Sequence, residues 1–190
     1  MRRKHNIRLV GRTVAVFAAA IVAIGLGAGA AGAHVVVQPG SLPKGASDVL
    51  VSFSAPNEST NGSNFTQLEV DLPLDHPLLS AYPQAMSGWT ATVTTTKLTK
   101  PVTTDDGTIT QAVSKIVWTA TGDGVPPSQF GLFTVLAGHL PADTSSLQLK
   151  AIQTYSDGTV VSWIEPTVKG SPAPEHPIPI LKLTGKVPKN

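Results

Sequence analysis

The chain has 190 residues, with 14 Lys and Arg against 12 Asp and Glu, and it has no cysteine. Without cysteine, disulfides, thiolate catalysis, sulfur-ligated zinc and blue-copper sites are excluded. Five of the basic residues lie in the first twelve positions, so the remaining residues are net acidic and give no sign of nucleic-acid binding.

The first 33 residues have the pattern of an export signal. A basic start is followed by an uncharged Ala/Val/Ile/Gly run over 13–33, which ends in Ala31-Gly32-Ala33. A basic region, an apolar region and an Ala-x-Ala site predict cleavage after Ala33. We therefore expect an exported protein, periplasmic, extracytoplasmic or secreted, with no membrane span after cleavage. The alternative is a retained N-terminal anchor, because the run is about long enough to cross a bilayer.

From His34 onward, short β-type runs are separated by Pro, Gly, Asn and Asp, and no segment has a helical period. Within one run, alternation places Thr66, Leu68, Val70 and Leu72 on the inward face. Asp157-Gly158 is a strong hairpin signal between the last two runs. The predicted strands are 48–54, 66–72, 89–96, 109–118, 130–137, 147–155 and 159–168.

About eight or nine strands at this spacing predict an all-β fold, an antiparallel two-sheet sandwich of Ig-like or cupredoxin-like kind. A closed barrel is the alternative. We expect one domain over 34–169, followed by a Pro-rich C-terminal tail over 170–190. Within that tail, Ile178, Ile180 and Leu183 are apolar enough to pack along the domain.

Cleavage after Ala33 would make His34 the first residue of the mature chain. Its α-amine and imidazole Nδ1 could then bind one metal ion in a six-membered chelate ring. Both groups lose a proton near neutral pH, at about 8 and about 6.5, so both can act as ligands there. Among divalent first-row ions this nitrogen pair favours Cu(II).

The chelate leaves coordination positions open, which a carboxylate or water would fill. Candidate carboxylates are Glu58, Asp157 and Glu165. Trp163 shares a strand face with Glu165 by the period of two. An indole beside the ion would exclude water, but the sequence pattern alone favours a plain core role for Trp163.

Seven segments resemble, in the same order, those of the YcnI-like proteins, the DUF1775 family. The resemblance covers about residues 34–168. The segments are His34-Val35-x-Val37-x-Pro39, Phe53-x-Ala55-Pro56-Asn57-Glu58, Leu68-Glu69-Val70-x-Leu72-Pro73, Gly88-Trp89, Val117-Trp118-Thr119-Ala120, Pro127-x-Gln129-Phe130-x-x-Phe133 and Tyr155-x-Asp157-Gly158-Thr159-Val160-Val161-x-Trp163.

The resemblance implies an exported cupredoxin-like sandwich that holds one Cu(II) through its N-terminal histidine, with a Glu and a Trp at the site. Carried onto this chain, His34 supplies amine and imidazole, Trp163 lies against the metal, and Glu58 is the carboxylate, with Glu165 as its competitor. The implied function is copper homeostasis or trafficking without catalysis. Its partners are the copper ion and other exported copper-handling proteins.

Two other functions remain open at this point. A copper oxygenase would need a second histidine ligand from among His76, His139 and His176. A metal-free adhesion or scaffold module would need only the sandwich and the Pro-rich segment. No Gly-x-Ser-x-Gly elbow, metalloprotease motif or phosphate-binding loop is found in the sequence after His34.

Overall fold

The computed structural model describes residues 34–104 and 107–185, so the expected export signal lies outside the described residues. These ranges contain twelve strands and no helix, and hence no helix that could cross a membrane. The strands are β1 Val36–Gln38, β2 Ser41–Pro43, β3 Ser47–Pro56, β4 Phe65–Asp71, β5 Ala81–Pro83, β6 Trp89–Thr104, β7 Gly107–Ala120, β8 Phe130–His139, β9 Ser146–Gln148, β10 Lys150–Tyr155, β11 Val160–Trp163 and β12 Ile180–Thr184.

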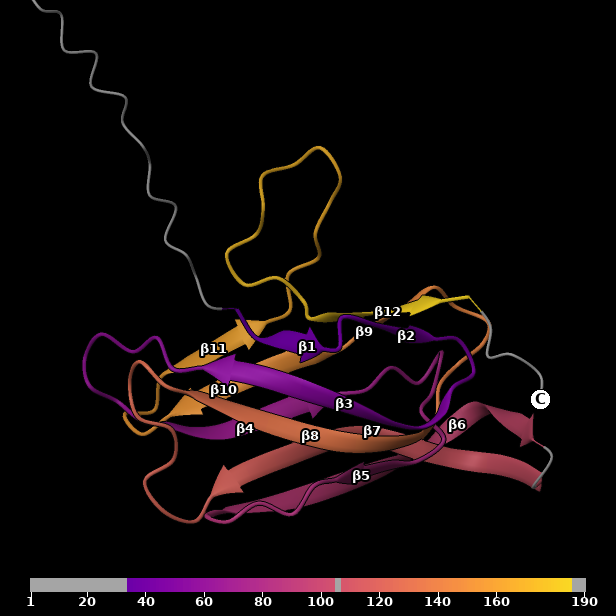
Figure 1. The fold of residues 1–190 in the computed structure, drawn as a ribbon, viewed down its shortest axis with the longest axis horizontal. Helices are drawn as coiled ribbons and strands as arrows, with labels where there is room; N and C mark the ends of the chain where they lie inside the picture. The colour runs from indigo at the N-terminus through magenta and orange to yellow at the C-terminus, as the bar shows by residue number, and fades with distance from the viewer. Residues whose placement is uncertain (1–33, 105–106, 186–190) are drawn as a thin grey trace, which may run out of the picture. The chain divides into compact units, whose positions relative to one another are not determined.

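Two open sheets pack face to face, as predicted (Figure 1). Sheet A has the order β1-β3-β8-β5, and sheet C has the order β11-β10-β4-β7-β6. A smaller sheet B, β2-β12-β9, contains a parallel pair between β12 and β2. All pairs within sheets A and C are antiparallel, and neither sheet closes on itself. The all-β sandwich is therefore confirmed, and the barrel is not formed.

The core lies between the inward-facing residues of sheets A and C. In β3 and β8 the alternate residues Phe53, Phe133 and Val135 are buried, because every second side chain points to the same face. Phe133 is the centre of an aromatic cluster that joins the two sheets. Its ring centroid lies 4.9 Å from that of Trp89, 5.5 Å from that of Trp118 and 5.7 Å from that of Phe65.

Two details differ from the alternation pattern. Phe65 is fully buried while Thr66 is only partly buried, because the pairing of β4 with β10 shifts register between Thr154 and Tyr155. The expected strand over 159–168 ends at Trp163. Beyond Ile164 the chain leaves the sheet, and Glu165 forms an isolated parallel bridge with Pro177.

The segment expected to be a tail is in part a strand. Residues 164–179 form a loop that projects from the domain (Figure 1), and β12 then pairs with both β2 and β9. Ile178 and Leu183 are buried, as their apolar character allowed, whereas Ile180 is exposed. The boundary expected at residue 169 therefore falls inside a loop, and the folded domain continues to Thr184.

Candidate metal centre

The candidate site lies where one edge of each large sheet comes together. β1 is an edge strand of sheet A and β11 is an edge strand of sheet C. His34 lies two residues before the start of β1, and Trp163 is the last residue of β11. The two rings meet edge to face, with centroids 5.4 Å apart and planes at 86°. Residues that are 129 positions apart in the sequence are therefore in contact.

Trp163 is held from the interior by Gln153. The indole nitrogen Nε1 donates to Gln153 Oε1 at 2.6 Å, and Gln153 Nε2 donates to the carbonyl of Pro56 at 2.9 Å. Gln153 is fully buried, so both of its polar ends are satisfied inside the protein. This one side chain connects Trp163 to the segment that leads into Glu58.

Sequence reasoning did not identify Gln153. The available signal is that Gln153 stands between Ala151 and Tyr155 in the inward register of β10. A polar residue at an inward position of a strand needs a buried partner, and an indole N–H is one.

We expect Gln153→Leu to lower the free energy of unfolding by about 1–3 kcal/mol, because it leaves a buried indole N–H and a carbonyl without a partner. Urea unfolding followed by circular dichroism measures the change. The control is Gln111→Leu, since Gln111 is exposed on β7 and should change stability by less than about 0.5 kcal/mol. Equal stabilities of the two variants would contradict the assigned role.

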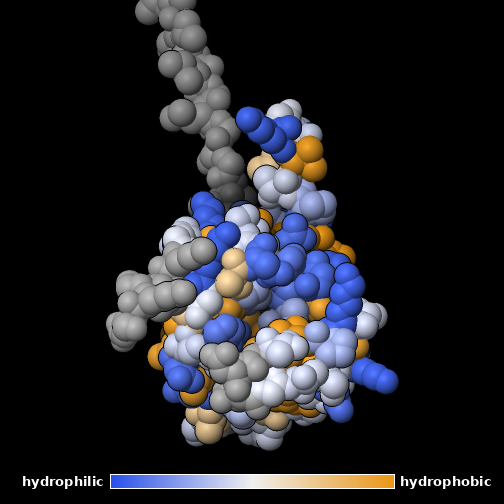
Figure 2. All heavy atoms as spheres, turned by 90° about the vertical axis from the view of Figure 1, so that its right-hand side faces the viewer, coloured by the Kyte–Doolittle hydropathy of each residue, from blue (hydrophilic) through white to orange (hydrophobic). Residues whose placement is uncertain are grey.

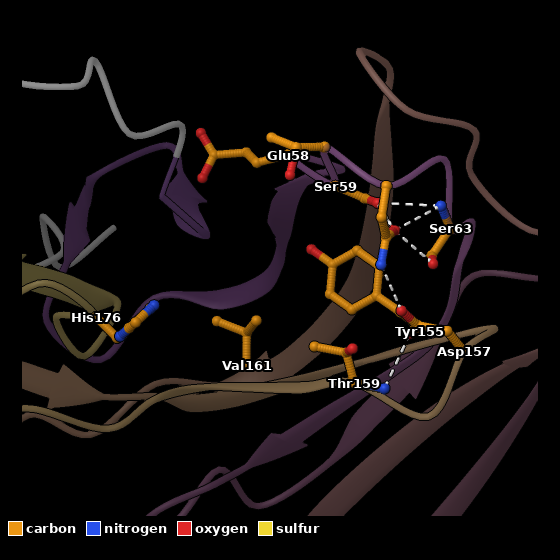
Figure 3. A pocket seen from close by; sticks show the side chains of 10 residues that line it. Glu58, Ser59, Ser63, Tyr155, Asp157, Thr159, Val161 and His176 are labelled. Atoms are coloured by element: carbon orange, nitrogen blue, oxygen red, sulfur yellow. Dashed lines mark hydrogen bonds between the residues drawn. The ribbon is translucent and has the colours of Figure 1, made fainter.

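Glu58 lies on a loop that is shaped by the buried Asn57. The Asn57 amide nitrogen donates to the carbonyls of Ser63 and Val125, and its Oδ1 accepts from the backbone N–H of Ser59. These bonds fix both ends of the loop while Glu58 itself stays exposed. In Figure 3 the Glu58 carboxylate points away from the hydrogen-bonded Ser59, Ser63 and Asp157, toward the side on which His176 lies.

A pocket of about 240 Å³ lies against this loop (Figure 3). Glu58 and His176 are among its lining residues, and the His176 ring also contacts Trp163, with centroids 5.1 Å apart. Burial, followed by the negative charge of Glu58, raises the pKa of the Tyr155 hydroxyl in the same pocket. Tyr155 therefore stays protonated at neutral pH and presents no charge to the pocket.

The two competing carboxylates are engaged elsewhere. Asp157 Oδ1 accepts from the N–H of Thr159 at 3.0 Å, and Oδ2 accepts from the amide of Asn61 at 2.8 Å. The Thr159 bond first, and then the Asn61 bond, hold the pKa of Asp157 well below its usual range. Glu165 Oε2 accepts from the backbone N–H of His176 at 3.1 Å, and the Glu165 N–H donates to the carbonyl of His176 at 3.0 Å. Glu165 therefore closes the base of the 164–179 loop.

Of the three histidines considered as second ligands, the structure brings one to Trp163. His176 contacts that indole directly. His76 is paired with Asp143 at 3.2 Å, and His139 is bonded to Ser47 at 2.9 Å, at the start of β3. His76 and His139 are thus engaged by groups outside the candidate site.

Over the described ranges, no three His, Asp or Glu side chains stand close enough together to form a metal site by themselves. A chelating N-terminal histidine does not need three such side chains, because it supplies two of the donors. Neither ring nitrogen of His34 is hydrogen-bonded to another residue in the described part of the chain, and His34 is only partly buried. The donor set would therefore fit Cu(II) if the α-amine of His34 were exposed by the expected cleavage.

Comparisons with known proteins agree with the fold. The family model described as "Domain of unknown function (DUF1775)" matches residues 34–183. The chain is similar to a solved structure from Nocardia farcinica, described as an uncharacterized protein with an immunoglobulin-like fold, with 35% identity and a TM-score of 0.63. That match covers 80% of this chain and 99% of the other. No curated protein matches significantly.

Proposed function

The protein belongs to the DUF1775 family, and we propose that it is an exported, non-enzymatic Cu(II)-binding protein of copper homeostasis or trafficking. The observation that carries the proposal is the contact between His34 and the buried Trp163, at the edge where the two sheets meet. This contact gives the residue behind the expected cleavage site a defined position in the fold. A first residue that bound no ligand would not need to be packed against the core in this way.

Within the proposal, His34 binds the ion through its α-amine and Nδ1, and Glu58 provides the third donor. Glu58 is preferred because it lines the same pocket as His176, whose ring contacts Trp163. Cu(II) would bind these nitrogen and oxygen donors, and water would fill the coordination positions that the protein leaves open. The edge-to-face contact with Trp163 positions the His34 imidazole, and the indole keeps water away from the part of the imidazole that it covers.

Replacing the carboxylate tests the ligand assignment. We expect Glu58→Gln to weaken Cu(II) binding by about 10- to 100-fold, the range seen even for residues that only support a ligand. Isothermal titration of the processed protein, which should bind one ion per chain, measures the effect. The matched control is Glu165→Gln, since a glutamine can still accept from the His176 N–H. If Glu165→Gln weakened Cu(II) binding more than Glu58→Gln, Glu165 and not Glu58 would be the carboxylate ligand.

The oxygenase alternative now depends on His176, because His76 and His139 have other contacts. It requires His176 to bind the same ion as His34 and the reduced protein to consume oxygen continuously. Oxygen uptake by copper-loaded protein with ascorbate distinguishes the alternatives. The non-enzymatic proposal expects no uptake above that of a His176→Phe variant, in which the ring contact with Trp163 can persist.

A further inference from the structure

The loop that carries Glu58 is attached to the hairpin that carries Trp163. We call residues 57–64 the Glu58 loop, and residues 150–163, which run from β10 to β11, the Trp163 hairpin. Polar surface by itself says little, since the end of the domain in Figure 2 is also mainly hydrophilic, with scattered apolar residues. The Glu58 loop is informative because its polar groups bond to this one hairpin.

Both ends of the Glu58 loop are bonded to the Trp163 hairpin. Where the loop begins, Gln153 Nε2 donates to the carbonyl of Pro56 at 2.9 Å. Where it ends, the Asn64 N–H donates to Ser156 Oγ at 3.1 Å, and the Ser156 N–H donates to the carbonyl of Asn64 at 2.8 Å. The loop therefore lies along the hairpin instead of extending away from it.

Between these ends, Asn61 and Asp157 form a contact that we call the clasp. Asn61 Nδ2 donates to Asp157 Oδ2 at 2.8 Å, while Asp157 Oδ1 accepts from the N–H of Thr159 at 3.0 Å. Asn61 Oδ1 accepts from the Ser63 N–H at 3.0 Å and from the hydroxyls of Ser59 and Ser63. A backbone N–H can only donate, so the N–H groups of Ser63 and Thr159 fix which atom of each side chain faces the other.

We propose that Asn61 and Asp157 are positioning residues for Glu58, and that the clasp holds the Glu58 loop in place before any metal is bound. This rests on the proposed function, in which Glu58 binds Cu(II). A ligand that is already in position loses less conformational entropy when the ion binds. The clasp should therefore raise the affinity for Cu(II) without contacting the ion.

Reversing the two side chains tests the clasp by rescue. Asp157→Asn alone leaves one donor facing another, because the new NH₂ group meets either the Thr159 N–H or the Asn61 amide nitrogen. Asn61→Asp alone brings two carboxylates together. The double variant, with Asn61→Asp and Asp157→Asn, keeps the net charge and restores a donor–acceptor pair at both contacts. General damage to the loop would not be repaired in this way.

Two readouts separate the clasp from copper binding. Exchange of the Ser63 and Asn64 amide protons, followed by NMR in EDTA, reports on the metal-free loop, and competition with a chromogenic chelator gives the Cu(II) affinity of the processed protein. We expect each single variant to speed this exchange at least about threefold and to weaken Cu(II) binding about three- to tenfold. The double variant should return both quantities to within about twofold of the parent.

Asp48→Asn is the matched control, since it also removes one exposed carboxylate but lies at the far end of β3 from Pro56. It should change neither quantity. Exchange in the double variant that stayed as fast as in the single variants would overturn the proposal. So would single variants with unchanged exchange, or with a loosened loop and the parent's affinity. If the parent bound no Cu(II), the proposed function would fail, whereas exchange in EDTA would still decide whether the clasp holds the loop.

Discussion

Blocking the α-amine of the processed chain by acetylation is expected to weaken Cu(II) binding by at least about 100-fold, more than the loss of a supporting residue. An acetylated nitrogen is an amide and no longer a basic donor, so the six-membered chelate at His34 cannot form. Reagent at near-neutral pH modifies the α-amine selectively, since its pKa is about 8 and that of lysine about 10.4. Competition against a chromogenic copper chelator measures the affinity.

His34→Ala is the companion variant, because it keeps the α-amine and removes the imidazole. We expect a loss of similar size, since each change destroys the same chelate ring. Circular dichroism should show an intact fold in both cases, because His34 precedes the first strand. An acetylated protein that binds Cu(II) as tightly as the unmodified one would remove the amine from the site.

Phe133→Ala is expected to lower the free energy of unfolding by about 3–5 kcal/mol, the largest stability change among the variants considered. Phe133 is fully buried in sheet A, and its ring contacts three aromatic residues of the opposite sheet C. Truncation leaves a cavity at the point where sheets A and C join, and close-packed neighbours relax only partly into it. Urea denaturation measures the loss.

Phe130→Ala is the matched control, because Phe130 is the same residue type on the same strand but is 62% exposed. We expect a change within about 0.5 kcal/mol in the free energy of unfolding. If Phe130→Ala destabilised the protein as much as Phe133→Ala, the core would not lie between the two sheets as described.

The sequence predicted the sandwich because its strands alternate strongly and its turns are marked by Gly, Pro and Asp. The hairpin at Asp157-Gly158 forms as predicted, with Gly158 at φ 84° and Asp157 accepting from Thr159. Thr66 was wrongly expected inside, because it is the extra residue of β4 where the pairing with β10 shifts register, and local alternation does not reveal such a shift. β12 was not predicted, because the prolines before it suggested an extended tail. Its partners β2 and β9 are distant in the sequence, so no local pattern indicated the pairing.

The candidate site was predicted in part. The expected cleavage after Ala33 singled out His34, and family resemblance singled out Trp163 and Glu58. Their arrangement depends on long-range contacts that no local pattern encodes, such as the Gln153 bridge from Trp163 to Pro56. The same holds for Glu165, whose place beside Trp163 in the strand period suggested a ligand, whereas its carboxylate closes a loop.

Electron paramagnetic resonance of the processed protein with one equivalent of Cu(II) tests directly whether His34 holds the ion. We expect a tetragonal spectrum with hyperfine splitting from nitrogen donors, part of which changes when histidine alone is labelled with ¹⁵N. The same signal should be missing from His34→Ala. A spectrum of hydrated Cu(II), or a nitrogen pattern that His34→Ala leaves unchanged, would contradict copper binding at the chain start.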